Sequence, residues 1–317
     1  MINGNAKSIV LNRRDFLITT GAVVTGVAIN KTLWAGGNST EKKLFTIGLS
    51  QYSLRESIRS GKLKPVDYPA FAKETFGIDY IDVWDGTFPD GEPERMALAK
   101  ELKKRADDIN SRIFLFMAGV LDATSQDDAE RKASAQEVTY WMDHAAVMGC
   151  TYYRIFLKAA DTTDEIALDR AAMALSHLGE MAKERKLKIA IEPGASRLSS
   201  SGTWLASLVK EKELPDVVLM PDFGKLKKEK LYTDTEAMMP YSQVVSAKSI
   251  EFDEQGLEVN FDYPRLLEII VNSGFRNILA IEYEGSKLPE VAGIQATQKL
   301  LEKIHSQLLS NCSANKE

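Results

Sequence analysis

Four charged residues stand at the ends of short apolar runs in the second half of the chain. The runs end at Glu192 in Ile-Glu-Pro, Asp222 in Pro-Asp-Phe-Gly, Lys248 in Ser-Ala-Lys-Ser and Glu282 in Ile-Glu-Tyr-Glu. When strands of a parallel sheet are each followed by a helix, their carboxyl ends lie on one rim, where active sites are found. We therefore expect three carboxylates and a lysine to converge in one pocket.

Such a pocket suggests a definite chemistry. Three carboxylates close together repel one another, and a divalent cation relieves that repulsion. Oxygen ligands favour Mg²⁺ or Mn²⁺, so Glu192, Asp222 and Glu282 are candidate metal ligands. A metal there would grip two adjacent sugar oxygens and polarise a carbonyl. Glu192 and Glu282, on opposite sides of the substrate carbon, would remove and return a proton, as in aldose–ketose isomerisation and in epimerisation next to a carbonyl.

The elements that must position these residues are eight strand-like runs, each followed by a helical pattern. Short apolar strands that alternate with helices indicate a parallel sheet covered on both faces. An open doubly wound sheet is the main rival, but no Gly-x-Gly-x-x-Gly follows the first run. We therefore predict an α/β fold with a single (β/α)8 TIM barrel. Its expected strands are Phe45–Ser50, Tyr80–Trp84, Arg112–Met117, Thr151–Phe156, Leu187–Glu192, Val217–Asp222, Gln243–Lys248 and Ile278–Glu282.

Helix boundaries follow from the residues that start and stop helices. Gly77 is expected to end the helix that begins at Pro65. Asp161 or Thr163 can cap the helix that runs to about Arg185. The last helix is expected over Pro289–Leu308, which leaves residues 309–317 as a polar tail and 41–308 as the barrel domain.

Residues 1–40 are predicted to be a targeting segment and linker rather than part of the fold. Arg13 and Arg14 precede an apolar stretch, Ile18–Ile29, as in a bacterial export signal. The adjacent arginines resemble a twin-arginine signal, which predicts an exported, periplasmic protein that contacts the membrane only through this segment. An uncleaved N-terminal anchor is the alternative.

Composition narrows the function classes. The 317 residues are 44% hydrophobic and carry a formal net charge of −5, and the sequence pI is about 5.5. Nucleic-acid binders normally show a basic footprint, so we predict no nucleic-acid partner. The basic cluster Lys225–Lys230 is interpreted as a solvated loop or helix face. Two cysteines, Cys150 and Cys312, give neither a disulfide framework nor a metal spacing.

The run-end motifs resemble the xylose-isomerase-like TIM barrels, a group that includes sugar phosphate isomerases and epimerases and ketose 3-epimerases. The resemblance rests on Ile-Glu-Pro, on Asp followed by Phe-Gly, and on the final Ile-Glu, and it covers nearly all of residues 45–308. It implies that Glu192 and Glu282 bind the metal and form the acid–base pair, and that Asp222 is a further ligand. It also implies that Arg154, on the fourth strand, contacts substrate oxygens.

The sequence departs from that family at the seventh strand, where a metal-binding histidine is usual in a His-x-Lys arrangement. Ser246 occupies the histidine position and Lys248 is retained. A second family histidine, shortly after Asp222, is also missing, and Lys225 lies nearby. Either the three carboxylates hold a metal with water completing its shell, or Lys248 neutralises them. A lysine there can also stabilise an enolate or alkoxide oxygen.

The three histidines, His144, His177 and His305, all fall in expected helices outside the barrel, where we interpret them as surface or packing residues. Glu284 and Asp253, close to the same rim, are interpreted as loop-capping residues. DNA-repair endonucleases share the barrel but use several rim histidines with zinc, so this class is disfavoured.

Aromatic residues also gather at strand ends, and sugars stack their C–H faces on such rings. They are Tyr52, Trp84, Phe223 and Tyr283, of which Tyr52 and Trp84 are candidate substrate contacts. Asp85, or Asp82 if it faces inward, is expected to bond a sugar hydroxyl.

These expectations predict a carbohydrate isomerase or epimerase that acts on a small-molecule sugar. The export signal favours a free sugar over a phosphorylated sugar as its substrate. A lyase or hydratase acting on a keto-sugar or keto-glycoside is the second enzymatic hypothesis, since it needs the same proton abstraction. The third is a non-catalytic sugar-binding barrel that has lost the metal histidine. The sequence carries no signal for a particular oligomeric state.

Overall fold

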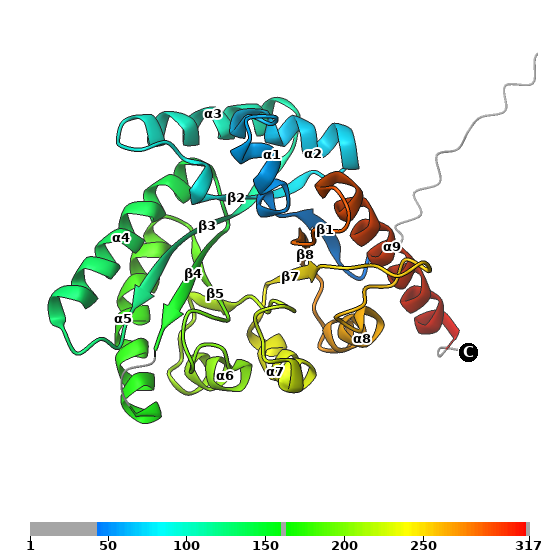
Figure 1. The fold of residues 1–317 in the computed structure, drawn as a ribbon. Helices are drawn as coiled ribbons and strands as arrows, with labels where there is room; N and C mark the ends of the chain where they lie inside the picture. Colours follow the sequence, from blue (N-terminus) through cyan, green and yellow to red (C-terminus); the bar gives the residue numbers. More distant parts are fainter. Residues whose placement is uncertain (1–42, 160–162, 315–317) are drawn as a thin grey trace, which may run out of the picture. The chain divides into compact units, whose positions relative to one another are not determined.

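The computed structural model describes residues 43–159 and 163–314, which form a TIM barrel of eight parallel strands (Figure 1). The proposed export signal lies outside the described residues. The strands follow the order β6-β5-β4-β3-β2-β1-β8-β7. Their bounds are β1 (Thr46–Leu49), β2 (Tyr80–Trp84), β3 (Arg112–Asp122), β4 (Tyr152–Lys158), β5 (Lys188–Glu192), β6 (Val217–Leu219), β7 (Val244–Ser249) and β8 (Ile278–Tyr283).

The seam between β6 and β7 closes the barrel with isolated pairings. Parallel bridges join Leu219 to Ser242 and Asp222 to Ser246, and the Ser246 N–H donates to the Pro221 carbonyl at 2.9 Å. The sixth strand was expected to reach Asp222, but β6 ends at Leu219. Pro221 has no N–H to donate to a ladder, which explains the interruption.

Nine helices among the described residues surround the strands (Figure 1). They are α1 (Arg55–Arg59), α2 (Tyr68–Phe76), α3 (Glu94–Asp108), α4 (Asp128–Val147), α5 (Asp164–Glu184), α6 (Gly202–Glu211), α7 (Leu231–Met238), α8 (Tyr263–Asn272) and α9 (Glu290–Ala314). No described helix is both long and apolar enough to cross a membrane.

Several predicted boundaries are confirmed, and two more differ from the expectation besides the end of β6. Gly77 ends α2 with a left-handed φ of 68°, and Thr163 caps α5 by accepting from the Ile166 N–H. The third strand continues past Met117 to Asp122 because its register shifts after Met117, and Gly119 there adopts a φ of 81°. The helix α9 continues past Leu308 to Ala314, so most of the expected polar tail is helical.

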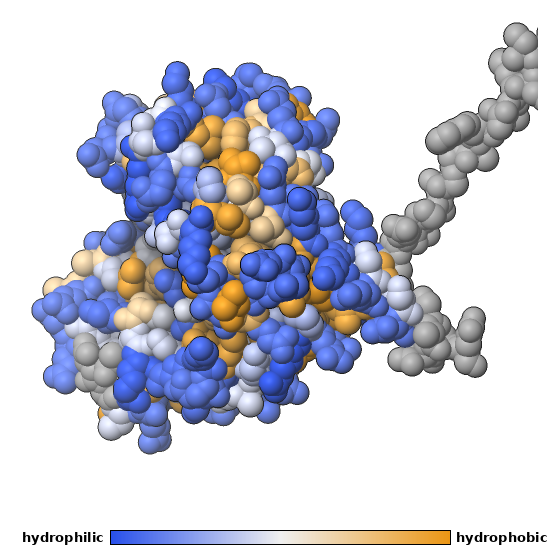
Figure 2. Space-filling view, turned by 45° about the vertical axis from the view of Figure 1, so that its right-hand side comes forward, coloured by the Kyte–Doolittle hydropathy of each residue, from blue (hydrophilic) through white to orange (hydrophobic). Residues whose placement is uncertain are grey.

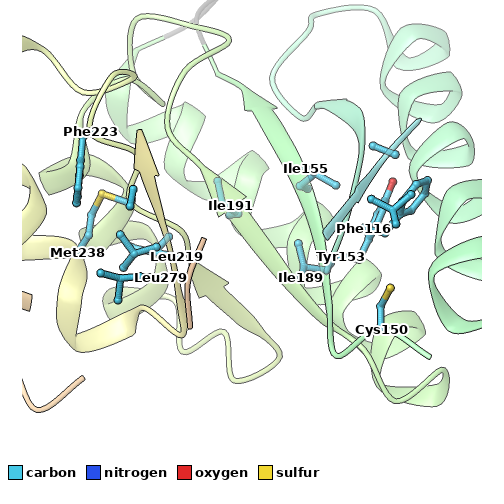
Figure 3. Packing of buried hydrophobic residues seen from close by; sticks show 14 of the residues in the cluster. Phe116, Cys150, Tyr153, Ile155, Ile189, Ile191, Leu219, Phe223, Met238 and Leu279 are labelled. Carbon is cyan, nitrogen blue, oxygen red and sulfur yellow. The ribbon is translucent and has the colours of Figure 1, made fainter. Parts of the chain in front are cut away.

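Alternation along the strands produces two separate cores. The outer core lies between strands and helices, and Figure 3 shows Ile189 and Ile191 of β5 beside Ile155 of β4 within it. The inner core fills the barrel with side chains such as Phe114, Ala190 and Ile278. The inner space is so restricted that a Cβ on Gly48 would lie 2.8 Å from the Ile278 side chain.

The surface is largely hydrophilic, and Figure 2 shows a band of hydrophobic residues across the face in view. Cys150 is a buried free thiol.

Tyr263, the first residue of α8, ties the outer core to the carboxyl end of β7. Its side chain is buried, and its hydroxyl lies 2.9 Å from the Ala247 carbonyl and 2.8 Å from the Lys248 carbonyl. The tyrosine therefore fixes the backbone that carries Lys248.

We predict that Tyr263→Phe lowers the free energy of unfolding by about 1–3 kcal/mol, because buried carbonyls lose their donor while the ring packing is kept. Urea unfolding measures this difference. Tyr232→Phe, at a half-buried tyrosine of α7, is the control and should change stability by less than about 0.5 kcal/mol. Equal effects of the two substitutions would contradict the assigned role of Tyr263.

Candidate active site

The inner lining of the barrel changes from apolar to polar at the carboxyl rim. Below the rim, the residues that face inward belong to the apolar inner core. One or two positions further along the strands, inward side chains are charged or polar, and all of them are buried. These residues are Ser50, Asp82, Arg154, Glu192, Asp222, Ser246 and Glu282. We call this set the polar layer.

The three carboxylates expected to converge do so. Glu192, Asp222 and Glu282 each offer a carboxylate oxygen, and these oxygens lie within 4.8 Å of one another. The exposed fractions are 2% for Glu192, 0% for Asp222 and 5% for Glu282. At this separation one small ligand or ion can contact all three.

Lys248 lies among these carboxylates and supplies one of two compensating cations. Its Nζ is 3.0 Å from Glu282 Oε1 and 3.4 Å from Asp222 Oδ2, and it also contacts Glu284 Oε1. Gly224 makes room for this side chain, because a Cβ there would lie 2.4 Å from Lys248 Cδ. Glu284, expected to cap a loop, is therefore an ion-pair partner within the site.

Arg154 supplies the second cation, from β4. Its Nε lies 2.9 Å from Glu192 Oε2, and its guanidinium stacks 4.3 Å above the centre of the Phe156 ring. Phe156 faces the same side of β4 as Arg154, two residues further along. The arginine is thus held against Glu192 and occupies the place that the family resemblance gave it.

Ser246 replaces the family histidine and makes a different contact. Its hydroxyl donates to Glu282 Oε2 at 3.0 Å. Asp222 Oδ1 accepts from the Gly224 N–H at 2.7 Å, whereas Asp222 Oδ2 is buried without a hydrogen bond. The contact of Asp222 Oδ2 with a cation is therefore the ion pair with Lys248 Nζ at 3.4 Å.

The two glutamates have pKa values that shift in opposite directions. Burial raises the pKa of Glu192 to about 8, with Arg154 opposing the rise and Asp222 and Glu282 adding to it. Burial also acts to raise the pKa of Glu282, but the ammonium of Lys248 and hydrogen bonds from its neighbours outweigh burial and lower it. Burial raises the pKa of Asp222 against the opposing charge of Lys248.

A divalent cation fits this donor set. Four carboxylates (Glu192, Asp222, Glu282 and Glu284) face two cations (Arg154 and Lys248), so full ionisation leaves −4 + 2 = −2. Asp222 Oδ2 lacks a hydrogen bond, and carboxylate oxygens suit hard cations. The net negative charge and the three converging carboxylate oxygens both favour a metal in this place.

Asp82, not Asp85, lies in the polar layer. Asp82 is fully buried, and its Oδ1 accepts from the Gln51 N–H at 2.9 Å. Asp85 starts a short 3-10 helix, Asp85–Thr87, after β2 has ended. Burial raises the pKa of the Asp85 carboxyl, and the charge of Arg154 opposes this rise.

Gln51 was missed by the sequence reasoning. Its Oε1 accepts from the Trp84 N–H at 2.9 Å, which leaves Gln51 Nε2 buried without a hydrogen bond, as are Ser50 Oγ and Asp82 Oδ2. Ser50 is next to Glu282, since its N–H donates to the Ile281 carbonyl at 2.9 Å. The pair Ser50-Gln51 at the end of the first strand was the available signal.

The aromatic residues at strand ends divide into two groups. Tyr52 and Trp84 pack edge to face with ring centres 4.8 Å apart, and both lie against the inner core. Phe223 and Tyr283 instead belong to the outer core, and Phe223 packs on Tyr263. Only the first pair lies against the inner core, on the side of the strands that carries the three carboxylates.

The histidines and Asp253 have structural roles, as expected. His144 of α4 is buried against Glu92, with Nε2 2.7 Å from Oε1, and His305 Nε2 accepts from the Leu44 N–H. His177 lies in α5. Asp253 Oδ1 accepts from two N–H groups of its own loop.

The fold and this rim define the chain as a barrel of the class that places its reactive groups at the carboxyl ends of the strands. A family model described as xylose isomerase-like TIM barrel matches residues 69–304. The chain belongs to that family.

Solved structures share the fold at low sequence identity. L-ribulose 3-epimerase is 13% identical, with a TM-score of 0.70, over 86% of this chain and 98% of that one. The IolI protein with a bound zinc atom is 15% identical, with a TM-score of 0.63, over 83% and 99%. The probable 3-DHS dehydratase AsbF from Bacillus anthracis is 14% identical, with a TM-score of 0.63, over 81% and 99%. No curated protein matches the sequence.

The raised pKa of Glu192 gives a test by pH. The carboxyl titrates near 4.5 when exposed and at about 8 in the fold, so the folded state binds the proton more tightly and stability falls as pH rises between these values. Glu192→Gln cannot lose this proton. Relative to the wild type, we expect the variant to gain stability steadily from pH 5 to pH 8 and to level off above.

Urea unfolding at pH 5, 7 and 9 with a chelator present measures this trend. Glu180→Gln, at an exposed glutamate of α5, is the control and should follow the wild type at every pH. A stability difference between Glu192→Gln and the wild type that does not change with pH would disprove the assigned shift.

Proposed function

We propose that the protein is a carbohydrate isomerase or epimerase that moves a proton next to a sugar carbonyl with Glu192 and Glu282. The observation that carries this proposal is the convergence of these two buried glutamates with Asp222, since their carboxylate oxygens lie within 4.8 Å of one another. The opposite directions of the pKa shifts of Glu192 and Glu282 support it. Two carboxyl groups whose pKa values are pushed apart are suited to act as an acid and a base at the same pH.

In this mechanism Glu282, which stays ionised, removes the proton from the carbon beside the carbonyl. The electron pair of the broken C–H bond moves to the carbonyl oxygen and forms an enolate. Glu192, in its protonated form, then delivers a proton to the other face of that carbon, which inverts its configuration. Exchange of protons with water restores both glutamates.

Lys248 and Arg154 stabilise the charges that this reaction produces. The Lys248 ammonium contacts Glu282 and Asp222 and can donate to the enolate oxygen in a site without bulk water. Arg154 stabilises Glu192 once that residue has given up its proton, because the two groups are 2.9 Å apart. Tyr52 and Trp84 offer aromatic surfaces for the apolar face of a sugar.

Glu192, Asp222 and Glu282 would hold the divalent metal, Mn²⁺ or Mg²⁺ by the hardness of their oxygens. When bound, such an ion polarises the substrate carbonyl and lowers the energy of the enolate. The zinc atom of the similar IolI structure supports a metal at this kind of site.

The similar structures support sugar chemistry and one alternative. L-ribulose 3-epimerase is a ketose epimerase by name, and AsbF is a probable dehydratase. A lyase or hydratase acting on a keto-sugar begins with the same proton removal, and differs in that the enolate then expels a group from the neighbouring carbon. The proposed export of the protein favours a free sugar or an oxidised glycoside over a sugar phosphate.

Deuterium incorporation tests the proton transfer. In heavy water with D-fructose, D-tagatose, L-ribulose and a 3-keto-glucoside, we expect the wild type to place deuterium next to the carbonyl of at least one sugar. Glu192→Gln and Glu282→Gln should each lower the rate at least 100-fold, the usual contribution of general acid–base groups. Mass spectrometry and NMR measure the label.

Glu180→Gln is the matched control and should keep the wild-type rate. Release of a fragment in place of a labelled sugar would favour the lyase alternative. Sugar binding without label in the wild type would show that the barrel only binds the sugar.

Metal binding is tested without any substrate. We expect Mn²⁺, Mg²⁺ or Zn²⁺ at millimolar concentration to raise the melting temperature of the chelator-treated wild type, because a ligand of the folded state stabilises it. Asp222→Asn removes one charge of the metal site and should abolish most of this rise. Asp108→Asn, on the surface of α3, should retain it. No rise with any ion would contradict metal binding and would leave Lys248 and Arg154 as the charges that balance the carboxylates.

A further inference from the structure

A cavity of about 350 Å³ adjoins the carboxylate site and reaches it at Lys248 and Glu284. Phe223, Leu226 and Phe261 form apolar parts of its wall, and Asn260 adds a polar group. Lys225 and Lys228 also line it. We call it the lysine-lined cavity. Because Lys248 lines this cavity and also contacts Asp222 and Glu282 of the polar layer, a ligand bound at the carboxylates can extend into the cavity.

The charge of the lysine-lined cavity is opposite to that of the neighbouring carboxylates. Its ionisable lining residues are Lys225, Lys228, Lys248 and Glu284, which gives +3 − 1 = +2. Glu284 is already engaged by Lys248. Among the described residues, neither Lys225 nor Lys228 forms an ion pair, so their positive charges are available to a ligand.

Lys225 is also held close to the polar layer. It follows Asp222 by three residues, and its N–H donates to the Asp222 carbonyl at 3.2 Å. Its Nζ lies 5.7 Å from the centre of the Phe156 ring, the ring over which Arg154 stacks. The cluster Lys225–Lys230, interpreted from the sequence as a solvated face, thus contributes two of its lysines to a cavity beside the site.

We propose that the lysine-lined cavity binds a negatively charged substituent of the substrate, so that the protein acts on an anionic sugar. This inference rests on the proposed function and specifies its substrate class. A carboxylate or a phosphate would each satisfy the two lysines, while the apolar wall packs against the carbon chain. The reacting carbons then lie over Glu192 and Glu282, and the anionic end lies away from the acidic residues that would repel it.

Three matched ketoses test the proposal on the full protein. D-Fructose is neutral, D-fructuronate carries a carboxylate at its end, and D-fructose 6-phosphate carries a phosphate there. Calorimetric titration measures the three dissociation constants. We expect at least one anionic sugar to bind fivefold or more tightly than D-fructose, with an advantage that shrinks as salt is added. The tighter of the two anions identifies the charged group.

Substitution of Lys225 and Lys228 tests whether these two lysines cause the tighter binding of the anionic sugar. Lys225→Gln and Lys228→Gln should each reduce it by about two- to fivefold, the range of a partly exposed ion pair, and the double variant should remove it. Binding of D-fructose should not change. Lys230→Gln is the matched control, because Lys230 belongs to the same basic cluster but does not line the cavity.

Equal affinity of the wild type for the neutral and anionic sugars would overturn this inference, as would an advantage that survives in the double variant. If neutral sugars alone show deuterium exchange, this inference fails while the proposed function stands. If none of the sugars binds and none is labelled, both fail.

Discussion

The ammonium of Lys248, set between Asp222, Glu282 and Glu284, is the interaction on which the rest of the site depends. Burying several carboxylates in the inner layer of a barrel is costly unless each has a cation or a donor. Lys248 supplies the cation for three of the carboxylates, and Arg154 supplies the cation for Glu192. The neighbouring structure is adapted to this lysine: Gly224 leaves space for its side chain, and the hydroxyl of Tyr263 holds its backbone.

This arrangement also explains why two glutamates of the same type behave differently. Glu282 shares the lysine and accepts from Ser246, so its charged form is favoured. Burial favours the protonated form of Glu192, and the like charges of Asp222 and Glu282 add to this effect while Arg154 opposes it. Ser246 stands where the family resemblance gives a histidine, and its hydroxyl donates a hydrogen bond that favours the charged form of Glu282. An acid and a base therefore result from burial combined with different charged neighbours.

Much of the fold and of the candidate site could be predicted because local sequence patterns determine them. A strand alternates its side chains, so the residue type at each run end, Glu192 or Asp222 for example, indicates what the rim presents. The predictions that failed also have physical reasons. Pro221 interrupts the sixth strand because it lacks an N–H, although its side chain fits an apolar run. Glu284 was interpreted as a loop residue, and Gln51 was overlooked, because their partners Lys248 and Trp84 lie on other strands.

The sequence by itself determined the eight alternating units, the barrel they build, and which charged residues reach its rim, because period and composition act over a few neighbouring residues. Only the tertiary structure decided which of these charges pair and which oxygen of Asp222 stays without a hydrogen bond. It also decided that two lysines of the cluster Lys225–Lys230, interpreted from the sequence as a solvated face, line a cavity beside the site. Pairing and burial depend on distances between segments far apart in the chain, and these distances exist only once the barrel has closed.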